Sequence, residues 1–329
     1  MNDDASRILV TGASGFVGRH LTAALAQRGA RVRASTRGIH PVPVIGAGEW
    51  VAVGRISGDT DWTSAIRGVG TVVHLAALAH QVDPRHQPRL EDYMEVNAAG
   101  SGRLAQAAAR SGSVRRFIFV SSIGAVREAS NVPVDEDTSP RPSSSYGRSK
   151  LAGEQAVREA LNGTGTDWCI LRPVLVYGPG NPGNMARLLR LVRTGVPLPL
   201  GGIQNRRSLV FVGNLADAII RMVEAPGPLN GVFHVADDEV VSTPGLVRLV
   251  AAADGRTARL WPAPGWALRL AARCGDAAGC VGLRTGVDSY SLNRLRESLE
   301  VPNRALRRNF GWSPGTTLEE GLRATLSAR

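Results

Sequence analysis

The sequence predicts an α/β protein whose first part is a doubly wound parallel sheet, followed by a smaller C-terminal α/β region. In the first half of the chain, short apolar runs alternate with helical stretches, which is the pattern of parallel strands covered by helices on both faces. Beyond Pro173, proline and glycine punctuate the chain, so a different region begins there. The expected domains are therefore 1–172, with returning segments near 209–235, and a second region formed by 173–208 and 236–329.

Local patterns predict the individual elements. Apolar runs predict strands at 7–11, 31–36, 50–53, 71–75, 116–121 and 167–171. Helical patterns follow a glycine-rich turn up to about residue 28 and cover 90–111 and 145–161. The runs 209–211 and 232–235 are also strand-like, and we expect both to return to the first sheet.

The formal charge of +11 comes almost entirely from arginine. Of the 39 basic residues only Lys150 is a lysine, which is what a GC-rich coding bias would produce. Since no clustered basic block or helix-turn-helix spacing accompanies the charge, we expect no nucleic-acid partner, whereas an anionic small molecule fits.

The N-terminal residues are polar and run directly into a strand, and no apolar stretch reaches membrane-spanning length. We therefore expect a cytoplasmic protein without stable membrane insertion. The three cysteines, Cys169, Cys274 and Cys280, lack the close pairing with histidines that a structural zinc site needs, so no metal is expected.

Three glycines lie between the first strand and the first helix in Gly12-Ala13-Ser14-Gly15-Phe16-Val17-Gly18. Gly12 permits a tight turn, Gly15 lets the backbone approach a pyrophosphate, and Gly18 lets the helix pack on the strand. The helix N-terminus then faces the anion. A turn that merely needs small residues is the alternative, but the position between strand and helix favours a dinucleotide-binding site.

The end of the second strand distinguishes the two nicotinamide cofactors. An acidic residue there would bind the ribose hydroxyls of NAD, whereas an arginine accommodates the 2′-phosphate of NADP. The stretch contains Ser35, Thr36 and Arg37 and no carboxylate, so it favours NADP(H), with NAD(H) possible. A solvated arginine in an arginine-rich chain is the alternative.

Tyr146 and Lys150 lie four residues apart at the start of a predicted helix and therefore project from the same face. A neighbouring ammonium would favour the phenolate and lower the pKa of the tyrosine toward the range of a general acid or base. Lys150 is also the one position where a compact ammonium, rather than a guanidinium, would matter. A solvated helix pair is the alternative.

A hydroxyl that holds the reacting oxygen is expected where the strand 116–121 ends. We favour Ser122 for this role, and we expect Ser121 to support the end of the strand, although the two could be exchanged.

These motifs together resemble those of the extended short-chain dehydrogenase/reductases. They are the glycine turn, His74-Leu75-Ala76-Ala77, Asn97, Ser122, the Tyr-x-x-x-Lys pair, and Arg172-Pro173 with Tyr177-Gly178-Pro179. The chain is most similar to bacterial sugar-nucleotide epimerases and 4-keto reductases. The resemblance covers essentially the whole chain and implies a Rossmann-type domain, a C-terminal sugar-nucleotide region, and a homodimer formed through the helices that carry Asn97 and Tyr146.

The resemblance also implies the residues that bind each ligand. The cofactor would contact Gly12, Ser14, Gly15, Phe16, Val17, Gly18, Ser35, Arg37, Arg55, Ile56, Leu75, Ala76, Ala77, Asn97, Lys150 and Pro173. The substrate would contact Ser122, Tyr146, Asn184 and Arg207, the last two at its diphosphate. A helix cap is the alternative for Asn184, and a surface charge is the alternative for Arg207. Relatives usually have Gly-Asp-Ile where this chain has Gly54-Arg55-Ile56, which leaves the adenine contact open.

The surroundings of the serine, tyrosine and lysine indicate the reaction. Dehydratases of the family usually carry an acidic pair where this chain has Ile123-Gly124, so dehydration is not expected. Arg37 favours NADPH, which suits reduction of the C4 keto group of a nucleotide-activated 4-keto-6-deoxy (N-acetyl)hexose, as in UDP-N-acetylquinovosamine formation for surface polysaccharide. The alternatives are an NAD-dependent UDP-sugar 4-epimerase, acting on UDP-glucose or UDP-GlcNAc, and a non-catalytic NADP sensor, a class that typically loses the tyrosine and lysine.

The stretch 261–270 combines two tryptophans, two leucines and an arginine. We expect it to form a helix packed on the C-terminal region, and contact with a membrane surface is the alternative.

Overall fold

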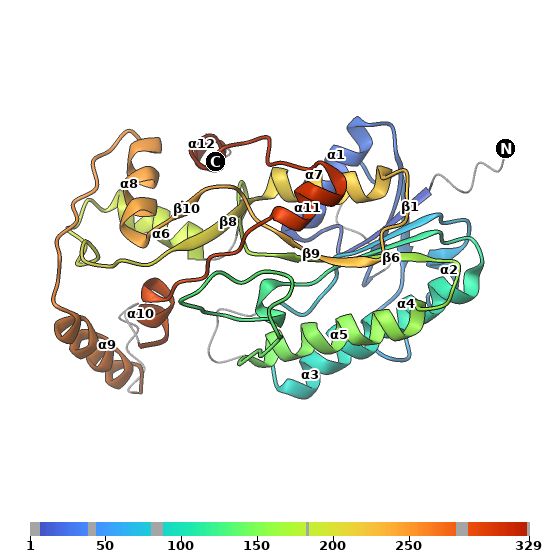
Figure 1. Ribbon diagram of the computed structural model, residues 1–329, viewed down its shortest axis with the longest axis horizontal. Coiled ribbons are helices and arrows are strands. Elements are labelled where there is room, and N and C mark those ends of the chain that lie inside the picture. Colours follow the sequence, from blue (N-terminus) through green and yellow to red (C-terminus); the bar gives the residue numbers. More distant parts are fainter. Residues whose placement is uncertain (1–6, 39–43, 80–87, 182–183, 281–288, 328–329) are drawn as a thin grey trace.

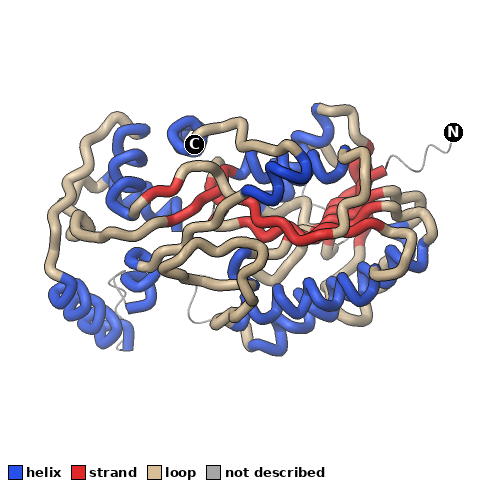
Figure 2. Tube along the Cα trace, viewed as in Figure 1, coloured by secondary structure: helices blue, strands red, loops and turns tan. Residues whose placement is uncertain are grey.

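The computed structural model describes residues 7–38, 44–79, 88–181, 184–280 and 289–327. Within them, a seven-stranded parallel sheet is the main element, and a smaller three-stranded sheet lies beside it (Figure 1, Figure 2). The large sheet contains β1 (Arg7–Thr11), β2 (Arg31–Thr36), β3 (Glu49–Ala52), β4 (Thr71–His74), β5 (Arg116–Val120), β6 (Asp167–Pro173) and β9 (Gly231–Val235). The predicted Rossmann-type fold is therefore confirmed.

The strand order of the large sheet is β3-β2-β1-β4-β5-β6-β9. The chain moves outward from β1 to β3, then crosses back to β4 on the other side of β1. A ligand site is expected at such a reversal, in the crevice beyond the carboxyl ends of the strands. The ends of β1 and β4 are joined in register there, since Thr11 pairs with His74.

Helices cover both faces of the large sheet, as Figure 1 shows. One face carries α1 (Phe16–Gln27) and α7 (Val212–Glu224), and the other carries α4 (Gly100–Ser111) and α5 (Ser145–Leu161). The short helices α2 (Thr63–Ile66) and α3 (Leu90–Met94) lie on the α4–α5 side.

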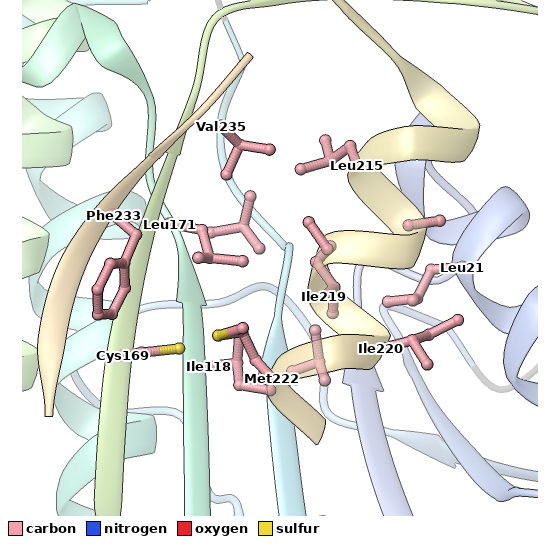
Figure 3. Packing of buried hydrophobic residues seen from close by; sticks show 14 of the residues in the cluster. Leu21, Ile118, Cys169, Leu171, Leu215, Ile219, Ile220, Met222, Phe233 and Val235 are labelled. Carbon is pink, nitrogen blue, oxygen red and sulfur yellow. The ribbon is translucent and has the colours of Figure 1, made fainter. Parts of the chain in front are cut away.

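Alternation along β5 explains why two separate cores form. Ile118 points toward α7, where it meets Ile219 and Met222 in one buried cluster (Figure 3). Phe117 and Phe119 point the other way and join the cluster beneath α4 and α5. A parallel strand that is buried on both faces is apolar along nearly all of its length, and residues 117–120 of β5 are Phe-Ile-Phe-Val.

The smaller sheet has the order β10-β8-β7, from β7 (Leu175–Tyr177), β8 (Arg207–Phe211) and β10 (Val240–Val241). Helices α6 (Asn184–Arg193), α8 (Thr243–Ala253), α9 (Gly265–Cys280), α10 (Ser289–Arg296), α11 (Arg304–Phe310) and α12 (Leu318–Ser327) complete this half of the chain. The predicted return of 232–235 to the first sheet is confirmed, because β9 pairs with β6. The predicted return of 209–211 is wrong, because β8 pairs with β7 and β10 instead.

The helix predicted at 90–111 is interrupted. Between α3 and α4, residues Glu95–Ala99 form a π-helical segment, η3. Such segments add one residue to a helix and are frequent at functional sites. This segment contains the predicted site residue Asn97.

Among the helices of the described ranges, none combines the length and apolar character needed to cross a membrane.

Candidate active site

The turn between β1 and α1 is shaped by its glycines. Gly12 has a φ of +70°, and a Cβ placed on it would lie 2.8 Å from the backbone nitrogen of Ala76. A Cβ on Gly18 would overlap the backbone of Gly12 and Ala13. The tight turn and the close packing predicted for Gly12 and Gly18 are thus both observed.

Helix α1 begins without a side chain that caps its N-terminus, since its N-cap is Gly15. Ser14 and Gly15 are exposed, while Phe16 and Val17 are half-buried. An uncapped helix N-terminus presents N–H groups and a partial positive charge to an anion. The turn therefore fits the pyrophosphate of a dinucleotide.

A buried chain of hydrogen bonds ties this turn to the end of β4. The backbone N–H of Ala76 donates to Thr11 Oγ1, which lies 2.6 Å from His74 Nδ1. His74 Nε2 lies 2.9 Å from Ser101 Oγ, and that hydroxyl donates to the carbonyl of Asn97. The directions fit one arrangement, in which Thr11 donates to Nδ1 and the ring donates through Nε2.

His74 is therefore held neutral. Burial lowers its pKa to about 3, and the charge of Lys150 acts in the same direction. The ring also stacks on Phe119 at 5.6 Å. Because the chain of bonds fixes Ala76 beside Gly12, the segment that contains Leu75, Ala76 and Ala77 lies at the turn, where the resemblance placed the cofactor.

The side chain of Asn97 is fully buried and its bonds are made within the protein. Its Oδ1 accepts from the backbone N–H of Leu78, and its Nδ2 donates to the carbonyl of Leu78 and to Ser149 Oγ. These bonds fix the loop after β4 to helix α5, and the predicted contact of Asn97 with the cofactor stays a prediction.

The other end of the predicted cofactor site is more open. Ser35 is buried at the end of β2, and Arg37 just beyond it is exposed. Arg55 is also exposed, whereas Ile56 packs with the core beneath α4. The structure thus presents two guanidinium groups near this edge and turns Ile56 inward.

Helix α5 carries Tyr146 and begins where the sequence predicts, because Ser144 caps it by accepting from the N–H of Gly147. The Ser122 hydroxyl lies close enough to the Tyr146 phenol to act on its pKa. Burial raises the pKa of Tyr146 to about 12, with Ser122 opposing the rise and Tyr93 adding to it. The prediction that Lys150 lowers the pKa of Tyr146 is therefore wrong.

Lys150 explains the difference, because its ammonium is engaged elsewhere. Its Nζ donates to the carbonyl of Val120 at 2.8 Å and lies 4.4 Å from the centre of the Phe119 ring. Burial lowers the pKa of Lys150 to about 8, against the opposing effect of the Glu154 carboxylate. The spacing of four residues placed both side chains on one face, but the acceptor at Val120 sets the direction of the ammonium.

Glu154, four residues after Lys150, belongs to a buried ion pair that sequence reasoning missed. Its carboxylate receives two bonds from the Arg172 guanidinium, at 2.9 and 2.6 Å, and one from Ser121 Oγ. This arrangement joins α5 to the ends of β5 and β6, next to the buried Pro173. It also gives Ser121 the supporting role that was expected. The sequence signal that could have identified Glu154 is its position four residues after Lys150, on the same face of the helix.

Glu128 is a second missed residue, and it fixes the start of α5. Its two oxygens accept from the backbone N–H and the hydroxyl of both Ser143 and Ser144, at 2.6 to 3.0 Å. Burial acts to raise the pKa of Glu128, but the four hydrogen bonds together lower it below its usual value. The residues directly before Tyr146 are thereby held in place.

The predicted substrate residue Arg207 lies on β8, in the smaller sheet. It is half-buried and donates to the carbonyl of Arg294 on α10. Burial and then the charge of Arg294 lower the pKa of Arg207, while Glu297 raises it. Arg294 was not predicted, and its charge acts on Arg207. Asn184 begins α6, and its side chain lies outside the described residues.

The glycine turn at the strand reversal, with a serine, a tyrosine and a lysine on neighbouring elements, defines a dinucleotide-dependent enzyme. Residues 8–236 match the NAD dependent epimerase/dehydratase family, and the chain belongs to this family.

Relatives of known name extend over most of the chain. A UDP-glucose 4-epimerase from Vibrio cholerae is 36% identical over 325 residues, which are 98% of this chain and 94% of the relative. An N-acetyl-alpha-D-glucosaminyl-diphospho-ditrans,octacis-undecaprenol 4-epimerase from Escherichia coli O157:H7 is 32% identical over 222 residues, which are 67% of this chain and 62% of the relative. The structure of MoeE5 in complex with UDP-glucuronic acid and NAD has a TM-score of 0.76 at 26% identity and covers 98% of both chains.

Proposed function

We propose that this enzyme reduces the C4 keto group of a nucleotide-activated 4-keto-6-deoxy hexose, with NADPH as the hydride donor. The single observation that carries the proposal is the half-buried Tyr146 beside Ser122, at the start of the helix that also carries Lys150, with a pKa raised to about 12. Such a phenol carries its proton at neutral pH, which is the form that a proton donor needs.

The residues divide the reaction between them. When bound, the reduced nicotinamide supplies a hydride to the carbonyl carbon. Tyr146 donates its proton to the oxygen that becomes the alcohol, and Ser122 donates a hydrogen bond to the same oxygen. Lys150 keeps a positive charge next to the site and, by the resemblance, holds the cofactor ribose. Ile123 is buried and Gly124 has no side chain, so this chain lacks the two acidic residues that dehydratases of the family carry at these positions.

Exposed Arg37 supports the choice of NADPH. It follows β2, whose end carries Ser35 and Thr36 and no carboxylate, and Arg55 after β3 adds a second guanidinium. Guanidinium groups bind phosphate by paired hydrogen bonds.

The pair Arg207 and Arg294 supports a nucleoside diphosphate as the activating group. Burial lowers the pKa of Arg207 and the charge of Arg294 adds to this effect, so a diphosphate bound here would stabilise the charged form of Arg207. We further infer that UDP is the nucleotide, which the named relatives support, and that the enzyme forms a homodimer through α4 and α5.

A UDP-sugar 4-epimerase is the second candidate, and the Vibrio cholerae relative favours it. An epimerase oxidises C4 and reduces it again, so its tyrosine must accept a proton as well as donate one. It also keeps NAD and shows no net redox change.

One pair of measurements distinguishes the candidates. The cofactor released from the purified enzyme is identified, and NADPH oxidation is then followed with a UDP-4-keto-6-deoxy sugar. Stoichiometric NADPH oxidation supports the reductase, whereas retained NAD with interconversion of UDP-glucose and UDP-galactose would replace it by the epimerase. Tyr146→Phe should abolish turnover and leave NADPH binding unchanged, and retained activity would contradict the role of Tyr146.

A further inference from the structure

The two exposed tryptophans of the chain lie at one place. Of the six tryptophans, Trp62 and Trp312 are buried and two more are half-buried, whereas Trp261 and Trp266 are 48% and 65% exposed. Leu270 is 56% exposed and lies one helical turn after Trp266 on α9. The expected helix forms from Gly265 and packs against α10 of the C-terminal region, whereas these three side chains are exposed.

Arginines flank these apolar side chains. Arg269 and Arg273 are exposed and lie one residue before Leu270 and three after it, so they border the same strip of helix surface. Between residues 259 and 276 the charged residues are Arg259, Arg269, Arg273 and Asp276, which sum to +2. Asp276 is engaged with Ser289 through both oxygens. We call Trp261, Trp266, Arg269, Leu270 and Arg273 the α9 face.

The α9 face lies at one end of the molecule. Figure 1 shows α9 at the end opposite β1, next to α10 and away from the large sheet. Helix α10 carries Arg294, whose carbonyl accepts from Arg207. The helix that carries the face is thus a neighbour of the helix to which Arg207 is hydrogen-bonded.

We propose that the α9 face docks on the surface of an anionic lipid bilayer. Tryptophan and leucine bury their apolar parts at the boundary between headgroups and acyl chains, and arginines at the rim pair with anionic headgroups. A second copy of this chain fits less well, because a twofold contact would place this cationic face against itself.

Vesicle binding tests the proposal with the full chain. The protein is sedimented with vesicles of phosphatidylcholine alone and with vesicles that contain about one third phosphatidylglycerol. We expect binding to the anionic vesicles that weakens as salt rises, together with a blue shift of tryptophan fluorescence. Absence of binding to the anionic vesicles would overturn the proposal.

Variants locate the contact. Arg269→Gln with Arg273→Gln should weaken binding by about 30-fold at low salt, since each arginine near such a surface contributes about fivefold. Trp261→Ser with Trp266→Ser and Leu270→Ser should abolish the fluorescence shift. Arg304→Gln with Arg308→Gln, both exposed on α11, is the matched control for the arginine variant. Val132→Ser, at a side chain that is 68% exposed, is the control for the apolar variant.

The outcomes are separable from those of the proposed function. None of these variants lies in the catalytic or binding machinery, so activity on a soluble sugar nucleotide should stay within about twofold. Equal loss of vesicle binding in the controls, or a mass of the native protein that falls when Trp266 is replaced, would contradict bilayer docking. The second result would make the face a contact between copies.

Discussion

Replacing Glu154 by glutamine tests whether the buried ion pair supports both the fold and the charge of Lys150. The change keeps the shape of the side chain and leaves the Arg172 guanidinium, whose side chain is 7% exposed, without a counter-ion. Removing one partner of a buried pair costs about 3 to 5 kcal/mol in the free energy of unfolding. The same change removes the carboxylate that raises the pKa of Lys150, so this pKa should fall below about 8.

Two measurements follow the Glu154→Gln variant. Urea unfolding gives the change in stability, and the rate as a function of pH gives the second effect. The protonated fraction of Lys150 decreases as its pKa falls, so the alkaline limb of the profile should move to lower pH. Glu159→Gln is the matched control, since Glu159 is exposed on the same helix, and its stability should change by less than about 0.5 kcal/mol.

A double variant separates charge from shape. Glu154→Leu with Arg172→Met removes both charges and should be more stable than Glu154→Gln, because apolar groups can replace a buried pair at little cost. The alkaline limb should still move. A loss below about 1 kcal/mol in Glu154→Gln, or an unmoved pH profile, would refute the reasoning.

Three further predictions concern the turn, the histidine and the start of α5. Gly18→Ala places a Cβ against the backbone of Gly12, so cofactor affinity measured by fluorescence titration should fall by about tenfold or more, whereas Gly227→Ala, with open space around it, should not change it. His74 has a folded pKa of about 3, below its unfolded value of 6.5, so its contribution to stability is complete above pH 6.5 and is lost as the pH falls. Between pH 7 and pH 5 the loss should be about 2 kcal/mol, and urea unfolding at both pH values should show a smaller loss in His74→Gln. Glu128→Gln should lower kcat by about tenfold and leave cofactor affinity unchanged, because it loosens the residues before Tyr146; an unchanged kcat would contradict that positioning role.

The sequence predicts most closely those features that local chemistry determines. Helix α5 begins and ends where expected, because Ser144 supplies a cap and the apolar pattern persists to Leu161. The positive φ of Gly12 follows from the same kind of local requirement.

Features that depend on distant partners were not predictable in this way. The pattern of 209–211 indicates a strand, but only its neighbours β7 and β10 decide which sheet it joins. The spacing of Tyr146 and Lys150 indicates a shared face, but the carbonyl of Val120, from another strand, directs the ammonium. Arg294 could not be associated with Arg207 from sequence, since 86 residues separate them along the chain.

The π-helical segment Glu95–Ala99 has a consequence for how this chain can change. One added residue rotates everything after it by about 100° around the helix axis. Beyond the segment, Ser101 faces His74, and Gly102 lies so close to Ala156 that a Cβ on it would be 3.0 Å from the Ala156 Cβ. Deleting one residue from the segment would rotate Ser101 and Gly102 away from these partners together. The contact with His74 and the packing of α4 on α5 therefore both depend on the same extra residue.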